Sequence, residues 1–234
     1  MKAMILAAGR GERLRPLTDT LPKPLVEVAD KPLIVYHIER LAEIGVTEIV
    51  INHAWLGHKL EQALGDGSRW QVKLHYSAEV EALETGGGIK QALPLLGDKP
   101  FLVINGDVFI EQLPQIQGQT LSDASALAAL RHHQAYLWLV DNPAQHPEGD
   151  FALADGQLSI EGEPKLTFSG IGLYHPSLFD NTPHGRFGLA PLLKKKMAVE
   201  SVAGEYFGHL WCDVGTPERL YALDARVRAK QLRD

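Results

Sequence analysis

A short segment after the first apolar run carries residue types that bind phosphate. Residues 9–18 read Gly-Arg-Gly-Glu-Arg-Leu-Arg-Pro-Leu-Thr and directly follow the apolar residues 3–8. Glycines let backbone N–H groups approach phosphate oxygens closely, and the guanidinium groups of Arg13 and Arg15 match phosphate geometry. Lys23 adds a point charge between two prolines. A surface turn with solvated arginines is the simpler alternative, but the combined spacing favours an anion site.

Two aspartates, far apart in the sequence, are candidates for binding a divalent cation. Asp107 follows an apolar run at residues 101–105, and Asp213 lies near the end of the strand predicted at residues 204–214. Carboxylate oxygens are the ligands that Mg²⁺ prefers in proteins. A Gly-Asp pair after a strand is also common in plain turns. The metal role therefore depends on whether the two aspartates lie near the phosphate-binding residues.

Other familiar sites are missing from the sequence. Leu14 breaks the G-x-G-x-x-G fingerprint, and no G-x-x-x-x-G-K-[ST] segment occurs. The histidine pairs lack zinc spacing. His37 falls on the apolar face of a predicted helix, which is typical of a buried, hydrogen-bonded core histidine. The predicted phosphate site therefore belongs neither to the P-loop class nor to the dinucleotide-binding class.

The elements that must position these residues alternate regularly in the first half. Strands are predicted at residues 3–8, 48–52, 72–76 and 101–105. Helices are predicted at residues 33–44, 56–64 and 86–96, with residues 9–21 as a loop. Asp30 is expected to cap the first helix. This alternation predicts an α/β fold, a Rossmann-like, doubly wound and mostly parallel sheet that binds ligands at the carboxyl ends of its strands.

The second half is less regular. Strands are predicted at residues 124–131, 135–140, 166–174 and 204–214, a loop at 141–149 and a helix at 217–233. No repeat, low-complexity tract or break in composition divides the chain. We therefore expect residues 1–234 to form a single domain.

Composition excludes several classes of protein. The 234 residues carry a net charge of −6, without the basic surplus of nucleic-acid-binding proteins. The single cysteine, Cys212, cannot form an internal disulfide bond. No apolar run reaches the ~18 residues of a membrane span, and the first residues do not resemble a signal peptide. We expect a cytoplasmic enzyme with no nucleic-acid or membrane partner, and the oligomeric state stays open.

Several of these motifs together resemble the sugar-1-phosphate nucleotidyltransferase family. The matching segments are residues 6–18, 22–25, 85–89, 105–107 and 211–217, so the resemblance covers nearly the whole chain. Within the family, residues 52–57 and 83–88 are similar to the uridylyltransferases that act on N-acetylmuramate 1-phosphate in bacterial cell-wall recycling. The resemblance implies a nucleotide-binding half at residues 1–110 and a sugar-binding half at 111–234.

The resemblance also implies roles for individual residues. Arg13 and Lys23 would be catalytic, neutralising the expelled pyrophosphate and the reacting phosphates, and Asp107 and Asp213 would hold Mg²⁺. The nucleotide UTP would be bound by Gly9, Gly11, Glu12, Arg13, Lys23, Gly86, Gly87 and Asn105. The sugar 1-phosphate would be bound by Glu84, Asn142, Gly149, Asp150 and Lys165.

One segment departs from the family pattern. Many relatives carry Glu-Lys-Pro before the late strand, whereas residues 161–165 here read Glu-Gly-Glu-Pro-Lys. Which of Glu161, Glu163 and Lys165 contacts the sugar phosphate is therefore open.

The sequence leaves other reactions possible. Another sugar 1-phosphate could be the substrate, such as glucose with dTTP or UTP, or mannose with GTP. A subunit that binds nucleotide-sugars without turning them over is a further alternative, although such subunits usually lose a loop arginine, the lysine or a metal carboxylate, and all are present here.

Overall fold

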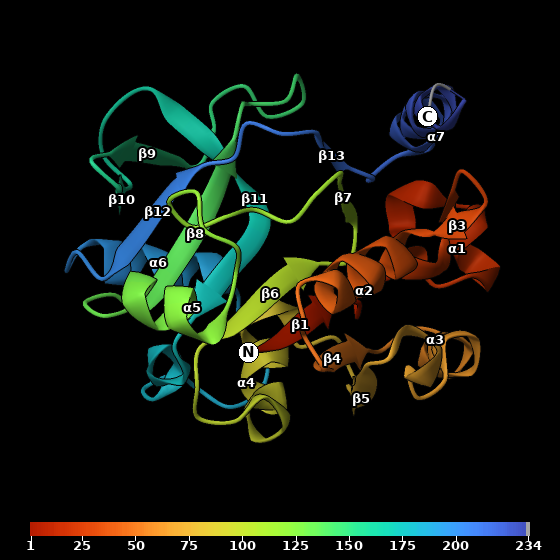
Figure 1. The fold of residues 1–234 in the computed structure, drawn as a ribbon, viewed down its shortest axis with the longest axis horizontal. Helices are drawn as coiled ribbons and strands as arrows, with labels where there is room; N and C mark the ends of the chain where they lie inside the picture. The colour runs from red at the N-terminus through yellow and green to blue at the C-terminus, as the bar shows by residue number, and fades with distance from the viewer. Residues whose placement is uncertain (233–234) are drawn as a thin grey trace.

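The computed structural model describes residues 1–232, and a nine-stranded mixed sheet runs through both halves of the chain (Figure 1). Its strands are β1 Lys2–Leu6, β4 Glu48–His53, β5 Lys73–Ala78, β6 Phe101–Asn105, β8 Ala135–Val140, β9 Phe151–Ala154, β10 Gln157–Ser159, β11 Lys165–Tyr174 and β12 Val202–Tyr206. Their order is β5-β4-β1-β6-β11-β8-β12-β10-β9. The predicted α/β architecture is confirmed.

The first four strands of this order are parallel. β1 lies between β4 and β6, and β5 adds to the far side of β4. The chain therefore builds outward in one direction through β4 and β5, and then returns to the other side of β1 with β6. Such a reversal opens a crevice at the carboxyl ends of the two strands, where open α/β sheets bind ligands.

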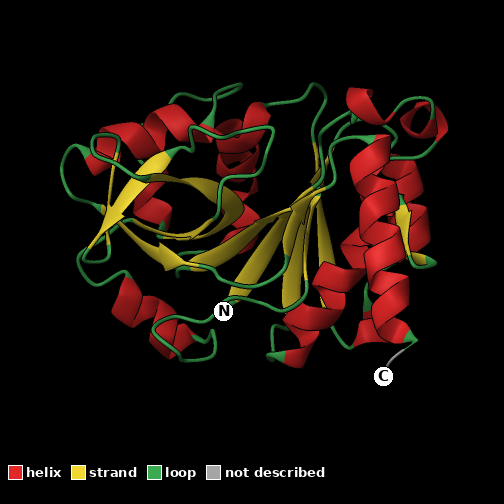
Figure 2. Ribbon diagram, turned by 90° about the horizontal axis from the view of Figure 1, so that it is seen from above, coloured by secondary structure: helices red, strands yellow, loops and turns green. Residues whose placement is uncertain are grey.

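Helices cover both faces of the sheet (Figure 2). One face packs against α2 Leu33–Glu43, α3 Gly57–Leu64 and α5 Asp123–Ala129, and the other against α4 Glu84–Leu96 and α6 Leu189–Met197. Side chains alternate between the faces along a strand, so Ile5 of β1 joins the core with α2 while Met4 joins the core with α4. Burial on both faces explains the continuous apolar runs of the sequence.

The second half interrupts the parallel pattern. β11 is antiparallel to both β6 and β8, β12 is parallel to β8, and β9 and β10 form an antiparallel hairpin at the edge. The strand predictions at residues 135–140 and 166–174 are confirmed, as is the loop at 141–149.

Small elements complete the fold. The short helices are η1 Glu12–Leu14, α1 Leu17–Thr20, η2 Lys23–Leu25, η3 Ser68–Trp70 and η4 Pro176–Phe179. Two ribbons pair β2 Glu27–Val28 with β3 Lys31–Pro32, and β7 Val108–Ile110 with β13 Trp211–Asp213. Helix α7 Pro217–Gln231 closes the chain and packs beside β2 in a third apolar cluster. Within residues 1–232, no helix has the length and apolar character needed to cross a bilayer.

The predicted strand at residues 124–131 is wrong, because residues 123–129 form the helix α5. The Ser122 side chain accepts a hydrogen bond from the Ser125 N–H, and the Ser125 hydroxyl accepts one from the Ser122 N–H. This reciprocal cap satisfies two backbone donors at the helix start, and the alanines that follow have the highest helix propensity.

Three further predictions need correction. The single strand expected at residues 204–214 is two strands, β12 in the main sheet and β13 in the ribbon with β7. Asp30 does not cap α2, whose N-cap is Pro32; it lies in the β2–β3 turn and pairs with Arg228. The loop at residues 9–21 contains the short helices η1 and α1. The last predicted helix is confirmed as far as Gln231, and Arg233 lies outside the described residues.

Candidate active site

The glycine-rich segment leaves the carboxyl end of β1 and turns back on itself. Gly11 has φ of +69°, a left-handed conformation that glycine adopts without strain, and the turn leads into η1. The buried Thr18 hydroxyl donates to the Gly11 carbonyl at 2.8 Å, which ties the far end of the segment to its start. The backbone is therefore held as a closed loop at the sheet edge.

A cavity of about 870 Å³ lies at this edge. Its walls are Leu6, Ala7, Ala8, Gly9, Gly11, Glu12, Arg13, Lys23, Pro24, Asn52, Glu81, Ala82, Leu83, Glu84, Thr85, Asn105, Gly106, Asp107, Gly185, Arg186 and Gly215. The ends of β1, β4 and β6 all contribute, so the cavity occupies the crevice where the strand order reverses. Most of the predicted nucleotide-binding residues line it: Gly9, Gly11, Glu12, Arg13, Lys23 and Asn105.

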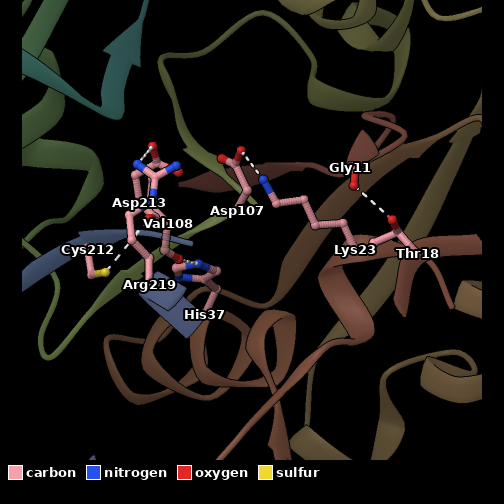
Figure 3. Close-up of polar contacts among 9 residues, drawn as sticks. All are labelled: Gly11, Thr18, Lys23, His37, Asp107, Val108, Cys212, Asp213 and Arg219. Atoms are coloured by element: carbon pink, nitrogen blue, oxygen red, sulfur yellow. Dashed lines mark hydrogen bonds and ion pairs between the residues drawn. The ribbon is translucent and has the colours of Figure 1, made fainter. Parts of the chain in front are cut away.

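Lys23 and Asp107 form an ion pair inside the cavity (Figure 3). The Lys23 ammonium lies 2.8 Å from Asp107 Oδ2, and the lysine is 7% exposed. Lys23 opens η2 between Pro22 and Pro24, which restrict the backbone on both sides. The carboxylate neutralises a cation that would otherwise be buried unpaired. An incoming phosphate would find the positive charge already positioned.

The β7–β13 ribbon brings the backbones of the two predicted metal ligands close together, although only Asp107 lines the cavity. Asp213 ends β13 opposite Val108, and the Val214 N–H donates to the Asp107 carbonyl at 2.9 Å. Asp213 Oδ2 accepts from Arg219 Nη1 at 2.9 Å (Figure 3). A methyl group added to Gly215, on the cavity wall, would lie 2.9 Å from Asp213 Oδ1 and 3.1 Å from Arg13 Nη2. The side chains of Arg13 and Asp213 therefore lie close together beside Gly215, at the edge of the cavity.

The residues present fit a magnesium ion shared with a substrate. Among residues 1–232, no group of three or more histidine, cysteine or acidic side chains could enclose a metal ion. Mg²⁺ is usually held by one or two carboxylates together with substrate phosphates and water. Two aspartates near the cationic glycine-rich segment match that donor set, and a protein-only metal cage does not.

His37 lies beneath the ribbon and is completely buried. Its Nε2 lies 2.8 Å from the Val108 carbonyl, which can only accept, so Nε2 carries the proton. Burial lowers the pKa of His37 to about 4, with a smaller contribution from the Arg40 charge. The predicted core histidine is thus neutral, and its Nδ1 has no hydrogen-bond partner.

The start of α4 forms another wall of the cavity. Glu84 lines it and pairs with Arg186 at 2.8 Å. Gly86 and Gly87 are buried behind this wall, and the Gly87 N–H donates to the Phe187 carbonyl at 3.0 Å. Gly86 and Gly87, which were predicted to bind the nucleotide, therefore do not line the cavity, and the N–H of Gly87 is engaged within the protein.

The predicted sugar-side residues of the second half lie together but do not line the cavity. The Asn142 amide donates to the Lys165 carbonyl at 2.9 Å, and Asp150 accepts from the Phe168 N–H at 2.8 Å. A methyl group on Gly149 would lie 2.7 Å from Asn142 Oδ1. These contacts join the loop after β8 to β11. Glu161 and Glu163 are exposed in the turn before that strand.

Some lining residues were not predicted. Asn52 ends β4 next to β1, a position that the strand pattern could have indicated. Gly185 and Arg186 reach the cavity from the loop before α6, and nothing in the local sequence marks them. Arg219 was not predicted either, although the structure pairs it with Asp213.

Comparison with known proteins identifies the class. The sequence model of the nucleotidyl transferase family matches residues 2–146, more than half of the chain. The chain belongs to this family. The solved structures that it resembles include a putative glucose-1-phosphate thymidylyltransferase from Bacillus anthracis, with a TM-score of 0.79 at 22% identity over 97% of this chain and 95% of that one. A UDP-glucose pyrophosphorylase complexed with UDP-glucose gives 0.76 at 20% identity over 98% of both chains. At these identities the likeness establishes the fold.

Curated relatives are more similar in sequence. An N-acetylmuramate alpha-1-phosphate uridylyltransferase of Neisseria meningitidis is 54% identical over 98% of this chain and 99% of its own length. The protein of the same name from Caulobacter vibrioides is 36% identical over 96% of both chains. A mannose-1-phosphate guanyltransferase of Aspergillus oryzae is 46% identical over 93% of this chain but only 62% of its own length.

Proposed function

We propose that this chain is an N-acetylmuramate α-1-phosphate uridylyltransferase, which joins UTP and N-acetyl-α-muramate 1-phosphate into UDP-N-acetylmuramate and pyrophosphate. The observation that carries the proposal is the 54% identity to the Neisseria meningitidis uridylyltransferase over essentially the full length of both chains. The cavity at the end of β1 supports it, because its cationic loop suits a triphosphate.

The chemistry requires little acid–base catalysis. An oxygen of the sugar phosphate attacks the α-phosphorus of UTP, a new P–O bond forms, and the bond to the β-phosphate oxygen breaks. The nucleophile is already ionised at neutral pH, so no general base is needed. The barrier lies in bringing two polyanions together, and fixed cations lower it by electrostatic stabilisation.

The residues of the cavity divide this task. Lys23, paired 2.8 Å from Asp107, would contact the α-phosphate and the incoming sugar phosphate. Arg13, beside Gly215, would hold the departing pyrophosphate. The backbone N–H groups of Glu12 and the loop glycines would wrap the triphosphate. The hydrogen bond from Thr18 to Gly11 holds the loop closed and so keeps these N–H groups close to one another.

Asp107 and Asp213 would hold Mg²⁺. When bound, the ion supplies charge neutralisation for the reacting phosphates. Asp213 is oriented by Arg219, and Asp107 by Lys23, so both carboxylates are fixed before substrate arrives. If Lys23 and Arg219 moved from the carboxylates to substrate phosphates, the oxygens of Asp107 and Asp213 would become free to bind the metal.

Nucleoside and sugar contacts belong to the same proposal. Asn105 would contact the nucleoside, and the backbone of Gly86 and Gly87 would meet the base. Sugar contacts are assigned to Glu84, Asn142, Gly149, Asp150 and Lys165. We further propose that the reaction takes place in the cytoplasm as part of peptidoglycan recycling, where it would return a salvaged amino sugar to the nucleotide-linked pool.

The test is pyrophosphate release by the purified chain with Mg²⁺. UTP, dTTP and GTP are each combined with the 1-phosphates of N-acetylmuramate, N-acetylglucosamine, glucose and mannose. Release confined to UTP with the muramate sugar supports the proposal. Release with GTP and mannose 1-phosphate would instead favour the activity named in the Aspergillus oryzae relative. Nucleotide-sugar binding without any release would point to a regulatory subunit.

A further inference from the structure

Two buried polar side chains, Asn52 and Glu79, connect the cavity wall at Ala7 with the cavity wall at Leu83. Asn52 ends β4 and is 2% exposed, and Glu79 follows β5 and is 6% exposed. Neither belongs to the residues assigned above to substrate or metal. A carboxylate at such depth is costly unless hydrogen bonds satisfy it, so its retention calls for an explanation.

Hydrogen bonds link the pair to both walls. Asn52 Oδ1 accepts from the Ala7 N–H at 2.9 Å, just past the end of β1. The Asn52 amide donates to Glu79 Oε1 at 2.7 Å, and Glu79 Oε2 accepts from the Leu83 N–H at 2.8 Å. The partners fix the orientation of the amide, because Ala7 offers only a donor and Glu79 only acceptors. One continuous chain of bonds therefore runs from Ala7 to Leu83.

Both ends of this chain of bonds reach the cavity. Ala7 and Leu83 line it, and so does Asn52 itself. Two residues after Ala7 the glycine-rich loop begins, and one residue after Leu83 helix α4 begins at Glu84. The pair thus sets the distance between the loop that would hold the triphosphate and the wall at the start of α4.

Helix α4 rests directly on the pair. A methyl group on Gly88 would lie 2.7 Å from Glu79 Oε1 and 2.8 Å from Asn52 Nδ2. Such distances are far inside van der Waals contact, so only glycine fits without moving the pair or the helix. The third glycine of the Gly86-Gly87-Gly88 run is therefore explained by close approach to this buried network, a role that the sequence pattern did not reveal.

We propose that Asn52 and Glu79 form a positioning clamp, which holds the glycine-rich loop in register with the wall at Leu83 for nucleotidyl transfer. The clamp rests on the proposed function for the reaction that it serves. It contacts neither reacting phosphate; it acts through the backbone of Ala7 and Leu83.

Exchanging the two functional groups provides the test. In Asn52→Asp, two carboxylates face each other at hydrogen-bond distance. In Glu79→Gln, the amide of the new side chain faces one of two donors, Asn52 or the Leu83 N–H. In the double variant the pattern is restored in reverse, because the carboxylate at 52 accepts from Ala7 and from the amide at 79, whose oxygen accepts from Leu83. All three variants keep the original side-chain shapes.

We expect each single variant to lower kcat/KM about tenfold or more, the scale of one unsatisfied buried polar group. The double variant should return to within a few-fold of the wild-type chain. Asn181→Asp and Glu200→Gln, the same replacements at exposed positions, are the matched controls and should change nothing. Melting curves are recorded for every variant, and kinetics are measured where all are folded.

The results separate a positioning role from a purely structural one. Single variants that melt earlier yet keep wild-type kinetics would overturn the clamp. A double variant as impaired as the singles, in folding or in turnover, would also overturn it. Kinetics use whichever substrate pair the wild-type chain turns over, and UTP binding by calorimetry is compared in parallel. A wild-type chain inactive with UTP and the muramate sugar would count against the proposed function alone.

Discussion

Replacing His37 with glutamine should remove a large part of the pH dependence of stability. The imidazole is completely buried beneath the β7–β13 ribbon, and its Nε2–H donates to the Val108 carbonyl. Burial, with a smaller effect of the Arg40 charge, lowers the pKa of His37 from 6.5 to about 4. The folded chain therefore holds a neutral imidazole at pH values where the unfolded chain is protonated.

The size and sign of the effect follow from this difference in pKa. Below pH 6.5 the unfolded state binds a proton that the folded state does not, so stability falls as the pH is lowered. The loss amounts to about 2 kcal/mol between pH 7 and pH 5, and to roughly 3 kcal/mol by pH 4. Above pH 6.5 the contribution of His37 is complete and no longer changes with pH.

Denaturant unfolding at several pH values measures the effect. The free energy of unfolding is determined for the wild-type chain, for His37→Gln and for His58→Gln, in which the same replacement is made on an exposed histidine. Other groups also titrate, so the informative quantity is the difference between curves. His37→Gln should flatten the curve by about 2 kcal/mol between pH 7 and pH 5. An unchanged slope in this variant would refute the reasoning.

Three other substitutions test separate parts of the structure. Trp55→Phe removes the indole N–H that donates to the Thr18 carbonyl at 3.1 Å, and should raise the KM for UTP about fivefold by loosening the phosphate loop. Arg219→Lys removes the guanidinium fork from Asp213 and should lower kcat about tenfold, measured at saturating substrate. Phe179→Ala should cost about 3–5 kcal/mol of stability by denaturant unfolding and leave KM unchanged, because this ring is 1% exposed in the core behind α4.

The first half of the fold could be predicted because its signals are local. A strand covered on both faces reads as an uninterrupted apolar run, and the strand at residues 101–105 matches β6 residue for residue. Gly45 and Gly65 likewise mark the ends of two helices, because glycine just after a helix is a local stop signal. Alternation of such elements then predicts a sheet of parallel strands.

The second half depends on information that no local pattern carries. The short apolar run at residues 124–131 has a length that fits a strand or a helix, and the Ser122 cap together with the helix propensity of alanine favours the helix. The run at residues 204–214 divides because β8 and β7 offer two separate partners, one in each sheet.

The candidate site shows the same limit. Arg13, Lys23 and Asp107 are carried by extended motifs, and the structure brings them to one cavity. Asn52 and Glu79 lie 27 residues apart and meet through a hydrogen bond, and Arg219 pairs with Asp213 on another element. Their types alone are ordinary, so only the three-dimensional arrangement reveals them.

The most direct test of the account compares the wild-type chain with Asp107→Asn in one assay. Both are given UTP, N-acetylmuramate 1-phosphate and Mg²⁺, and pyrophosphate and UDP-N-acetylmuramate are quantified together. The account predicts equal amounts of both products from the wild-type chain. It predicts a loss of turnover in Asp107→Asn, assayed at a temperature where its melting curve shows it to be folded, because the change also leaves Lys23 without its carboxylate partner. A wild-type chain that forms neither product, or a fully active Asp107→Asn variant, would contradict it.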